Sequence, residues 1–497
     1  MEPKKTKSLC PQCLKVIDAV VFEQDGKILM KKRCPEHGEF DDVYWSDADL
    51  YHKFENWHFE ADESDAGIQT TMLEKGCPFD CGLCPEHRSS TMLALIDLTN
   101  RCNQHCPTCF ANAAVAGYLY EPTMEQLVAM MKLLRSEVPP CPAIQFAGGE
   151  PTVRENFVEI VRKARELGFS HIQVATNGIA MSKSVEFCHA LKEAGLHTVY
   201  LQFDGVTDAP YEKLRGIPAL KTKLQAIDNC WAGEIKSVVL VPTLARGVND
   251  DQIGAIMRFA ATKLHIIKGV NVQPIAFEGR VDDAERKRLR ITIPDFIRLL
   301  EEQTNGEIPA ESFYPVPFVL PVSHFVEAWK QVPQVEFTVH PHCGAATYVF
   351  VVDGKFVPIT DFMDVEGFME FLKENAEETS RGRIRKLRAT AGLFQALRKF
   401  VDKDEAPEGF EPLKLLANIL GIGTREAVAE FHRQALFIGA MHFMDPYNYD
   451  MDRVKRCGIH YATPDGRIIP FCSYNAIHRP LVERAFSKPY HTPEASN

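Results

Sequence analysis

Residues 98–110 read LTNRCNQHCPTCF, and this stretch decides the fold. Its cysteines, Cys102, Cys106 and Cys109, follow the spacing CxxxCxxC. Three thiolates can hold three corners of a [4Fe–4S] cluster, whereas four would saturate it. The remaining iron is then open to chelate the amino and carboxylate groups of a ligand. A zinc knuckle is the alternative, but it needs a fourth nearby ligand. The pattern therefore favours an open-iron cluster.

From residue 93 onward, short apolar strands alternate with amphipathic helices. The expected strands cover residues 93–98, 143–147, 171–176, 198–203, 237–241 and 269–273. Helical patterns fill several connections, at 124–138, 154–167, 184–194 and 251–264. These strand–helix units predict an α/β fold with a parallel sheet and right-handed crossovers, either open or curled into part of a barrel. Ligand groups are then expected after the carboxyl ends of the strands.

Polar groups follow the expected strands at the points where a site would form. The turn Gly148-Gly149-Glu150-Pro151 comes directly after the second strand. Its glycines let the backbone approach a ligand closely, and its carboxylate can receive an ammonium group. Later strands end at further polar residues, namely Thr176, Asn177, Gln202, Asp204, Thr243 and Asn249. Each alone is an ordinary turn residue, but together they predict one continuous site.

On these motifs, residues 93–280 resemble the radical S-adenosylmethionine superfamily. The resemblance implies a partial (β/α)6 TIM-like barrel whose cluster binds S-adenosylmethionine. A one-electron reductant, such as a ferredoxin or flavodoxin, would drive cleavage of this cofactor to a 5′-deoxyadenosyl radical. The resemblance also implies which residues contact S-adenosylmethionine, namely Gly148, Gly149, Glu150, Thr176, Asn177, Gln202, Arg215 and Thr243.

A second triad, Cys77, Cys81 and Cys84, has the same spacing as the first. No apolar strand precedes it, and no Gly-Gly-Glu turn follows at the right distance. We therefore expect Cys102, Cys106 and Cys109 to hold the active cluster. The earlier triad is assigned an auxiliary [4Fe–4S] cluster, with structural zinc as the alternative and His87 as a possible fourth ligand.

The remaining cysteines form two groups and three single residues. Cys10, Cys13, Cys34 and His37 follow a CxxC…CxxH pattern, which indicates one tetrahedral zinc or iron ion. Single thiols at Cys141, Cys188 and Cys230 are expected to be buried and inert.

The last group comprises Cys343, Cys457 and Cys472, each beside a turn. Its layout resembles the SPASM-type extensions of the superfamily, which hold auxiliary [4Fe–4S] clusters. His342 or His460 would complete the ligand set, and three buried thiols are the alternative. Three clusters and one mononuclear ion are thus expected in all.

Length and composition suggest a large catalytic domain with additions at both ends. The 497 residues divide into a metal-binding module at 1–60, an auxiliary-cluster segment at 61–92, a core at 93–290 and a mainly helical extension with auxiliary clusters at 291–497. A net charge of −11 argues against nucleic-acid binding. No secretion signal or membrane-spanning run is evident, so we expect a cytoplasmic protein.

The whole-chain layout, from the N-terminal CxxC…CPEHG module to the segment 457–472, resembles the archaeal tetraether lipid synthases. That resemblance implies coupling of the terminal methyl carbons of isoprenoid chains in archaeal diether lipids, giving tetraether or macrocyclic products. Apolar helical stripes expected within 393–400, 413–420 and 437–443 would suit such a substrate. A basic cluster at 381–388 would allow peripheral membrane contact.

Other functions remain open from the residues. One is a radical enzyme that matures a peptide or a small cofactor with the help of auxiliary clusters. Another is a non-catalytic electron carrier with several clusters, although such a protein would not need an open iron or the Gly-Gly-Glu turn. A zinc-dependent nucleic-acid-binding module is disfavoured by the acidic charge.

Overall fold

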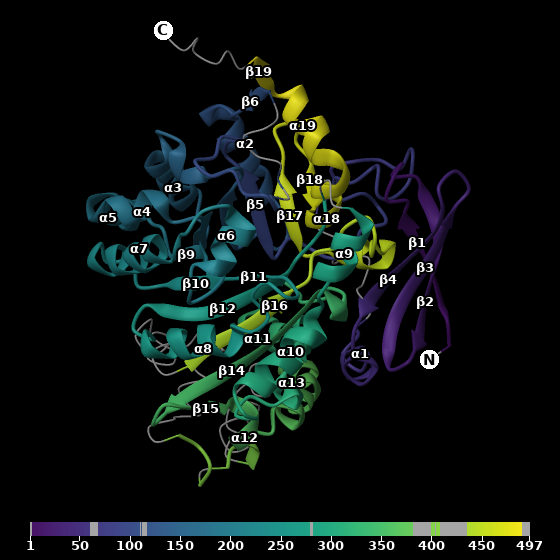
Figure 1. Ribbon diagram of the computed structural model, residues 1–497, viewed down its shortest axis with the longest axis vertical. Coiled ribbons are helices and arrows are strands. Elements are labelled where there is room, and N and C mark those ends of the chain that lie inside the picture. Colours follow the sequence, from purple (N-terminus) through teal and green to yellow (C-terminus); the bar gives the residue numbers. More distant parts are fainter. Residues whose placement is uncertain are drawn as a thin grey trace.

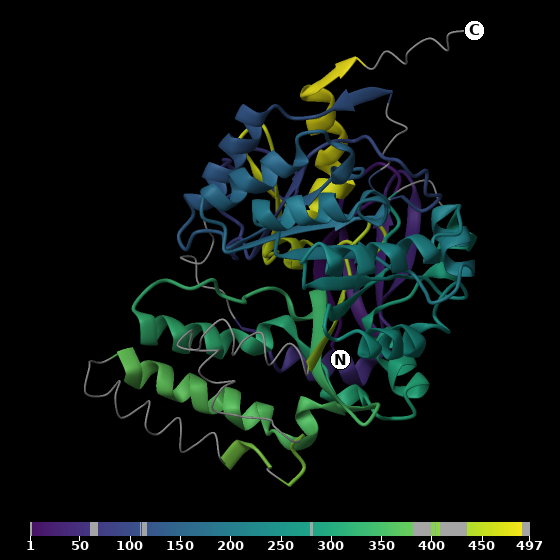
Figure 2. The same cartoon turned by 90° about the vertical axis from the view of Figure 1, so that its left-hand side faces the viewer.

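The computed structural model describes residues 2–59, 68–109, 111, 117–278, 282–380, 399–402, 404–407 and 435–489. Figures 1 and 2 show a large α/β body with a small antiparallel sheet beside it. Apart from Phe400, the apolar stripes expected within 393–400 and 413–420 lie outside these residues, as does the basic cluster at 381–388. Every helix within the described ranges is too short or too polar to cross a membrane.

The N-terminal module is an antiparallel sheet in the order β1-β2-β3-β4, followed by one helix. Its elements are β1 (Lys4–Leu9), β2 (Val16–Gln24), β3 (Lys27–Cys34), β4 (Gly38–Trp45) and α1 (Ala48–Glu55). Asp25 and Gly26 join β2 to β3 with φ values of 51° and 71°, the left-handed conformations of a tight hairpin turn. The loops after β1 and β3 carry the Cys10 and Cys34 motifs.

Six parallel strands form the centre of the main sheet, as the sequence predicts. They are β5 (Leu93–Asp97), β7 (Ala143–Ala147), β8 (His171–Thr176), β9 (Thr198–Gln202), β10 (Val238–Val241) and β12 (Ile267–Pro274), adjacent in that order. The connecting helices pack their apolar faces on the strands in one continuous core; they include α2 (Met124–Arg135), α3 (Phe157–Glu166), α5 (Val185–Ala194), α7 (Leu220–Ala232) and α8 (Ile253–Thr262). The predicted partial barrel is confirmed.

The C-terminal region extends this sheet at both edges (Figure 1). On one edge, β16 (Ala435–Met441) pairs in parallel with β12, and β14 (Gly344–Val352) pairs antiparallel with β16. On the other edge, β17 (Ile459–Ala462) pairs in parallel with β5 and antiparallel with β18 (Ile468–Pro470). Residues from the chain's end therefore lie beside the first strand of the core.

One helix expected in this region is wrong. The apolar run at 437–443 is the buried strand β16 and not a helical stripe. A short apolar run fits either structure when periodicity is the only guide. Strand β14 forms a hairpin with β15 (Lys355–Pro358), and the chain turns at Asp353 and Gly354.

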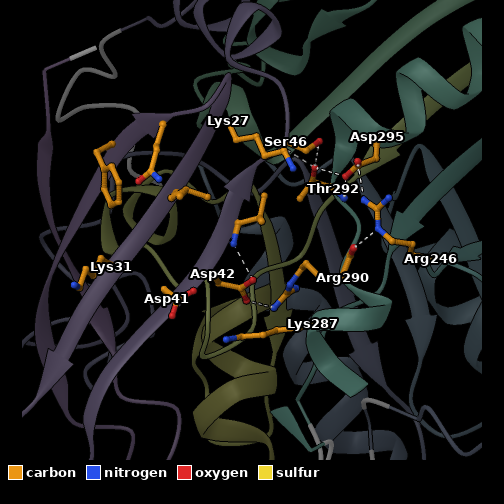
Figure 3. Close-up of a pocket in the computed structure, with 14 residues that line it drawn as sticks. Lys27, Lys31, Asp41, Asp42, Ser46, Arg246, Lys287, Arg290, Thr292 and Asp295 are labelled. Carbon is orange, nitrogen blue, oxygen red and sulfur yellow. Dashed lines mark hydrogen bonds and ion pairs between the residues drawn. The ribbon is translucent and has the colours of Figure 1, made fainter. Parts of the chain in front are cut away.

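Buried ion pairs join the module to the core, at one side of a cavity of about 620 Å³ (Figure 3). Asp42 of β4 accepts from Arg286 Nη1 at 2.5 Å and from Arg290 Nη2 at 2.7 Å. Arg290 also donates to Asp445 at 2.8 Å. All four side chains are buried. This network fixes β4 against α9 (Asp283–Leu289) and the loop after β16.

Candidate metal centres and active site

The cysteine loop leaves the carboxyl end of β5 and borders a cavity of about 420 Å³ that all three of its cysteines line. Buried side chains hold its backbone. Arg154 donates to the carbonyl oxygens of Leu98 at 2.8 Å and Pro122 at 2.7 Å. Burial raises the pKa of Cys102 to about 12 and also raises that of Cys106. Metal loading at these thiols must therefore release protons.

The two glycines of the Gly-Gly-Glu turn bring its backbone against the cysteine loop. The Gly149 amide donates to Thr99 O at 2.7 Å, and the Glu150 amide donates to Arg101 O at 2.8 Å. A Cβ at either glycine would lie 2.3 Å from a carbonyl oxygen of that loop. The close approach that the sequence suggested is therefore made to the cluster-bearing backbone, while both glycines also line the cavity.

Glu150 is 1% exposed and lies at the base of the cavity. Its Oε1 accepts from the side chain of Thr152 at 2.5 Å and from that of Thr176 at 2.7 Å, and its Oε2 accepts from the Asn177 amide at 2.8 Å. Burial raises the pKa of Glu150, although these hydrogen bonds oppose the rise. The carboxylate therefore ties the ends of β7 and β8 together where an ammonium group would bind.

We expect Glu150→Gln to weaken S-adenosylmethionine binding by at least ~10-fold. An amide at this position turns one acceptor into a donor that faces other donors, and each buried unsatisfied group costs about 1–3 kcal/mol. Anaerobic equilibrium dialysis of the cluster-loaded protein measures the affinity. Glu159→Gln on the exposed face of α3 is the matched control. An unchanged affinity in Glu150→Gln would remove this carboxylate from the binding site.

The other predicted contacts with S-adenosylmethionine converge around buried Asp204. Arg215 makes two hydrogen bonds of 2.8 Å to the Asp204 carboxylate and one of 2.8 Å to Thr243 Oγ1. Gln202 donates to Asp204 at 2.7 Å. Lys223 of α7 donates to Asn177 O at 2.6 Å and links the two groups. No motif marks Lys223, so the sequence did not identify it.

The wall above the cysteine loop is lined by amides on the inward positions of the strands. Gln173 donates to Gln145 at 2.5 Å, and Gln273 lies 3.4 Å from the Tyr200 hydroxyl, which Asn271 also contacts. Across the cavity lie side chains from the C-terminal region, namely Phe443, Tyr461, Phe471, Asn475 and Arg479. No motif in the sequence marks this wall, although a lone glutamine within each of several apolar strands is a usable signal.

Aromatic rings form the apolar part of that opposite wall. Phe443 and Phe471 stack with their ring centroids 3.8 Å apart, and Tyr461 packs on Phe471 at 5.4 Å. Arg479 lies over the Tyr461 ring and donates to Asp97 at 2.5 Å. A flat, polar molecule could therefore stack on the rings and bond to the amides.

Cys77, Cys81 and Cys84 come together in a loop held by Asp80, whose Oδ2 accepts from three successive amides at 2.6–2.7 Å. The three cysteines and His87 line one small cavity. His87 Nε2 is also 2.9 Å from Cys457 O. The first auxiliary site thus lies close to the second predicted cysteine group.

That second group occupies three turns around buried Arg453. Arg453 Nε donates to Cys343 Sγ at 3.4 Å, and the Met444 amide donates to Cys472 Sγ at 3.3 Å. Cys457 lies two residues before the start of β17. The two histidines suggested as further ligands have other contacts: His342 lies near Tyr51 and Glu55, and His460 near Thr91 and His87.

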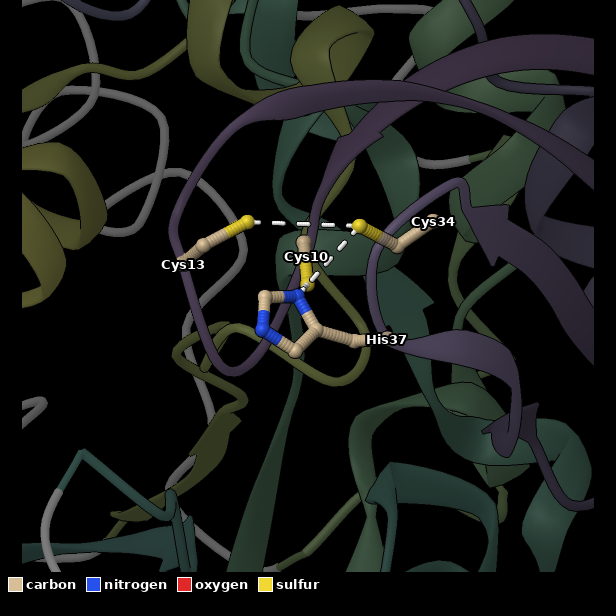
Figure 4. A group of neighbouring side chains, drawn as sticks. All are labelled: Cys10, Cys13, Cys34 and His37. Carbon is tan, nitrogen blue, oxygen red and sulfur yellow. Dashed lines mark hydrogen bonds between the residues drawn. The ribbon is translucent and has the colours of Figure 1, made fainter.

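Cys10, Cys13, Cys34 and His37 form a compact group at one end of the module (Figure 4). Their ligand atoms all lie within 4.8 Å of one another. His37 Nδ1 is 3.5 Å from both Cys10 Sγ and Cys34 Sγ. Three sulfurs and one imidazole at this separation fit a single tetrahedral ion. In the described part of the chain, neither auxiliary cysteine triad converges this tightly.

Cys13→Ser is expected to remove about one equivalent of metal and to loosen β1–β4, because such sites supply folding free energy to small domains. Metal analysis measures the first effect, and faster proteolysis within residues 2–46 measures the second. Glu36→Gln, an exposed neighbour paired with Lys15, is the control. Full metal content with an unaltered digestion pattern in Cys13→Ser would contradict this assignment.

Comparisons with known proteins agree with this geometry. The model of the radical SAM superfamily matches residues 96–260, and that of the HMPTM N-terminal zinc ribbon domain matches residues 2–46. The fold and the site define a radical SAM enzyme, which uses S-adenosylmethionine and a [4Fe–4S] cluster.

Individual relatives show to which family within this superfamily the chain belongs. The 7,8-dihydro-6-hydroxymethylpterin dimethyltransferase of Methanocaldococcus jannaschii is 52% identical over 489 residues, which cover 98% of this chain and 96% of that protein. The chain belongs to the family of that enzyme. A GTP 3′,8-cyclase of Paenarthrobacter nicotinovorans is 25% identical over 44% of this chain and 62% of its own length. The structure of Streptococcus suis SuiB bound to S-adenosylmethionine has a TM-score of 0.34 at 15% identity, covering 44% of each chain.

The expected membership of the tetraether lipid synthases is therefore wrong, and so is the expected coupling of isoprenoid chains. The relative that matches nearly the whole chain is a pterin methyltransferase. The error has a physical cause. Cysteine spacing indicates metal sites and says nothing of the side chains that line the rest of the cavity.

Proposed function

We propose that this protein is a radical SAM methyltransferase that adds methyl groups to a 7,8-dihydropterin, with 7,8-dihydro-6-hydroxymethylpterin as the substrate. Its near full-length similarity to the M. jannaschii enzyme supports the proposal. Each methylation replaces one carbon-bound hydrogen of the pterin by a methyl group, so the reaction also consumes a methyl donor. A ferredoxin- or flavodoxin-type protein is proposed as the electron source.

The observation that carries this proposal is the amide-lined wall beside the cysteine loop. A pterin is a flat heterocycle whose edge presents several hydrogen-bond donors and acceptors. Gln145 and Gln173 offer matching groups on the adjacent strands β7 and β8, and Gln273 and Asn271 add others on β12. Phe443 and Phe471 provide an apolar surface opposite.

The same wall disfavours a hydrocarbon chain. Buried amides that face an alkyl group lose their hydrogen bonds to water without replacement, at a cost of about 1–3 kcal/mol each. A lipid tunnel would need apolar side chains at positions 145, 173 and 273, where this chain has glutamine.

When bound, the cluster and S-adenosylmethionine supply a 5′-deoxyadenosyl radical, which removes hydrogen from carbon. The protein's own residues position the partners. Cys102, Cys106 and Cys109 are proposed to hold the cluster. Glu150, Asn177 and the group around Asp204 would orient S-adenosylmethionine, and the aromatic wall would keep water from the reacting carbon.

The auxiliary sites complete the proposal. Cys77, Cys81 and Cys84 are proposed to hold one auxiliary [4Fe–4S] cluster, and Cys343, Cys457 and Cys472 a second. Cys10, Cys13, Cys34 and His37 are proposed to bind zinc, which the match to a zinc ribbon supports.

Replacing one glutamine of the amide-lined wall tests the identity of the substrate directly. We expect Gln173→Leu to raise the KM for the dihydropterin at least ~10-fold. The variant loses a hydrogen bond and leaves the buried amide of Gln145 without its partner. Cleavage of S-adenosylmethionine without substrate should be retained. Gln24→Leu, at the exposed end of β2 in the module, is the control. An unchanged KM, with Gln24→Leu also unchanged, would show that the pterin binds elsewhere.

A further inference from the structure

A cluster of potential metal ligands outside the active site lies between the module and the C-terminal region. Glu55 is the last residue of α1, His340 caps the short turn Pro341–Cys343, and His342 lies within that turn. One ligand atom from each of the three residues lies within 4.8 Å of the other two. The pair His342 Nδ1 and Glu55 Oε1 is 3.5 Å apart.

The facing atoms in this cluster are buried without hydrogen-bond partners. His342 is 0% exposed and His340 is 1% exposed. Among the described residues, Glu55 Oε1, His340 Nε2 and His342 Nδ1 make no hydrogen bond, although the 3.5 Å contact joins the first to the last. Leaving a buried polar atom unsatisfied costs about 1–3 kcal/mol. One cation could satisfy all three atoms, which lie within 4.8 Å of one another, once the His340 ring carries its proton on Nδ1.

Neighbouring groups fix the orientation of the His342 ring and the Glu55 carboxylate. His342 stacks on Tyr51 with ring centroids 4.0 Å apart, and its Nε2 donates to Tyr51 O at 3.3 Å. That bond places the proton on Nε2 and leaves Nδ1 as the free lone pair. His58 Nδ1 lies 3.7 Å from Glu55 Oε2, which turns Oε1 toward His342.

We propose that Glu55, His340 and His342 bind one divalent metal ion, at a site separate from the Cys10 group and from the predicted clusters. Two imidazoles and one carboxylate are a common ligand set for zinc and for ferrous iron. The ion joins the end of α1 to the turn before Cys343, and so connects the module to an auxiliary cysteine.

The positions of the protons on the two rings decide whether the cluster can take a cation. Neutral imidazoles are the form that binds metals. His340 Nδ1 accepts from the His342 amide at 3.3 Å. Binding at Nε2 requires the proton of that ring on Nδ1, so this long contact must lengthen when the ion binds.

Metal analysis tests the proposal. The protein is purified anaerobically, incubated with excess zinc and desalted, and zinc, iron and manganese are counted. We expect His340→Ala/His342→Ala and Glu55→Gln each to hold about one equivalent of metal fewer than the unaltered protein. His324→Ala, a surface histidine on α11 (Leu320–Lys330), should lose none.

Two further results make the test decisive. The Cys13→Ser variant should lose one equivalent independently, so that combining it with Glu55→Gln removes two. Native-like circular dichroism of Glu55→Gln excludes unfolding as the cause of any loss. Equal metal content in the unaltered protein and in both variants of the cluster would overturn the proposal, and would leave the three residues as a buried proton-sharing network. This outcome does not depend on the pterin substrate.

Discussion

Replacing Cys102, Cys106 and Cys109 together by alanine is expected to lower the formation of 5′-deoxyadenosine at least ~1,000-fold, to the background without protein. When several residues act as one unit, an enzyme loses nearly all of its activity once any one of them is removed. The three thiols line the same cavity as Glu150 and Arg215, so no other described cysteine group can take their place. Liquid chromatography of anaerobic reactions with dithionite and S-adenosylmethionine measures the product.

The matched control is the triad of identical spacing. Replacing Cys77, Cys81 and Cys84 by alanine should preserve cleavage of S-adenosylmethionine, because these residues line a different, smaller cavity with His87. If cleavage survives loss of the first triad and disappears with the second, the two assignments must be exchanged.

Asp42→Asn is expected to destabilise the protein by about 3–5 kcal/mol, the usual cost of removing one partner from a buried ion pair. Asp42 is the carboxylate shared by Arg286 and Arg290, and all three side chains are buried where the module meets the core. An asparagine leaves two guanidinium groups balanced only by Asp445 and by the more exposed Asp283.

Urea denaturation followed by fluorescence measures this effect. Asp41→Asn is the control, because Asp41 is the exposed neighbour on the same strand. The variant should unfold at a clearly lower urea concentration than the control. Coincident midpoints would show that the network adds no stability across this junction.

Much of the core could be predicted from the sequence. Strands such as Ala143–Ala147 and His171–Thr176 are short apolar runs followed by polar turns, and local signals of that kind determine both their type and their end. The Cys102 loop and the Gly148–Glu150 turn are local motifs as well. Their meeting follows from the rule that parallel strands place their carboxyl ends at one edge.

Contacts between distant segments could not be predicted in this way. Strand Ala435–Met441 reads as helix or strand until its pairing with Ile267–Pro274 is known. Arg479 reaches Asp97 across 382 residues of chain. The cavity wall that we propose to bind the substrate combines Gln145 and Gln173 with Phe443 and Phe471, and no single stretch of sequence contains it. The radical SAM superfamily was therefore identified correctly, while the lipid substrate was not.

The central claim is that this radical enzyme methylates a dihydropterin, and mass spectrometry of the pterin tests it most directly. Reconstituted protein, reductant and 7,8-dihydro-6-hydroxymethylpterin are incubated anaerobically with methyl-labelled S-adenosylmethionine, or with a clarified extract that contains the cell's one-carbon donors. We expect a pterin that gains the mass of one methyl group and then of a second. The variant in which alanine replaces Cys102, Cys106 and Cys109 should give no such product. Formation of 5′-deoxyadenosine with an unaltered pterin under both donor conditions would contradict the claim.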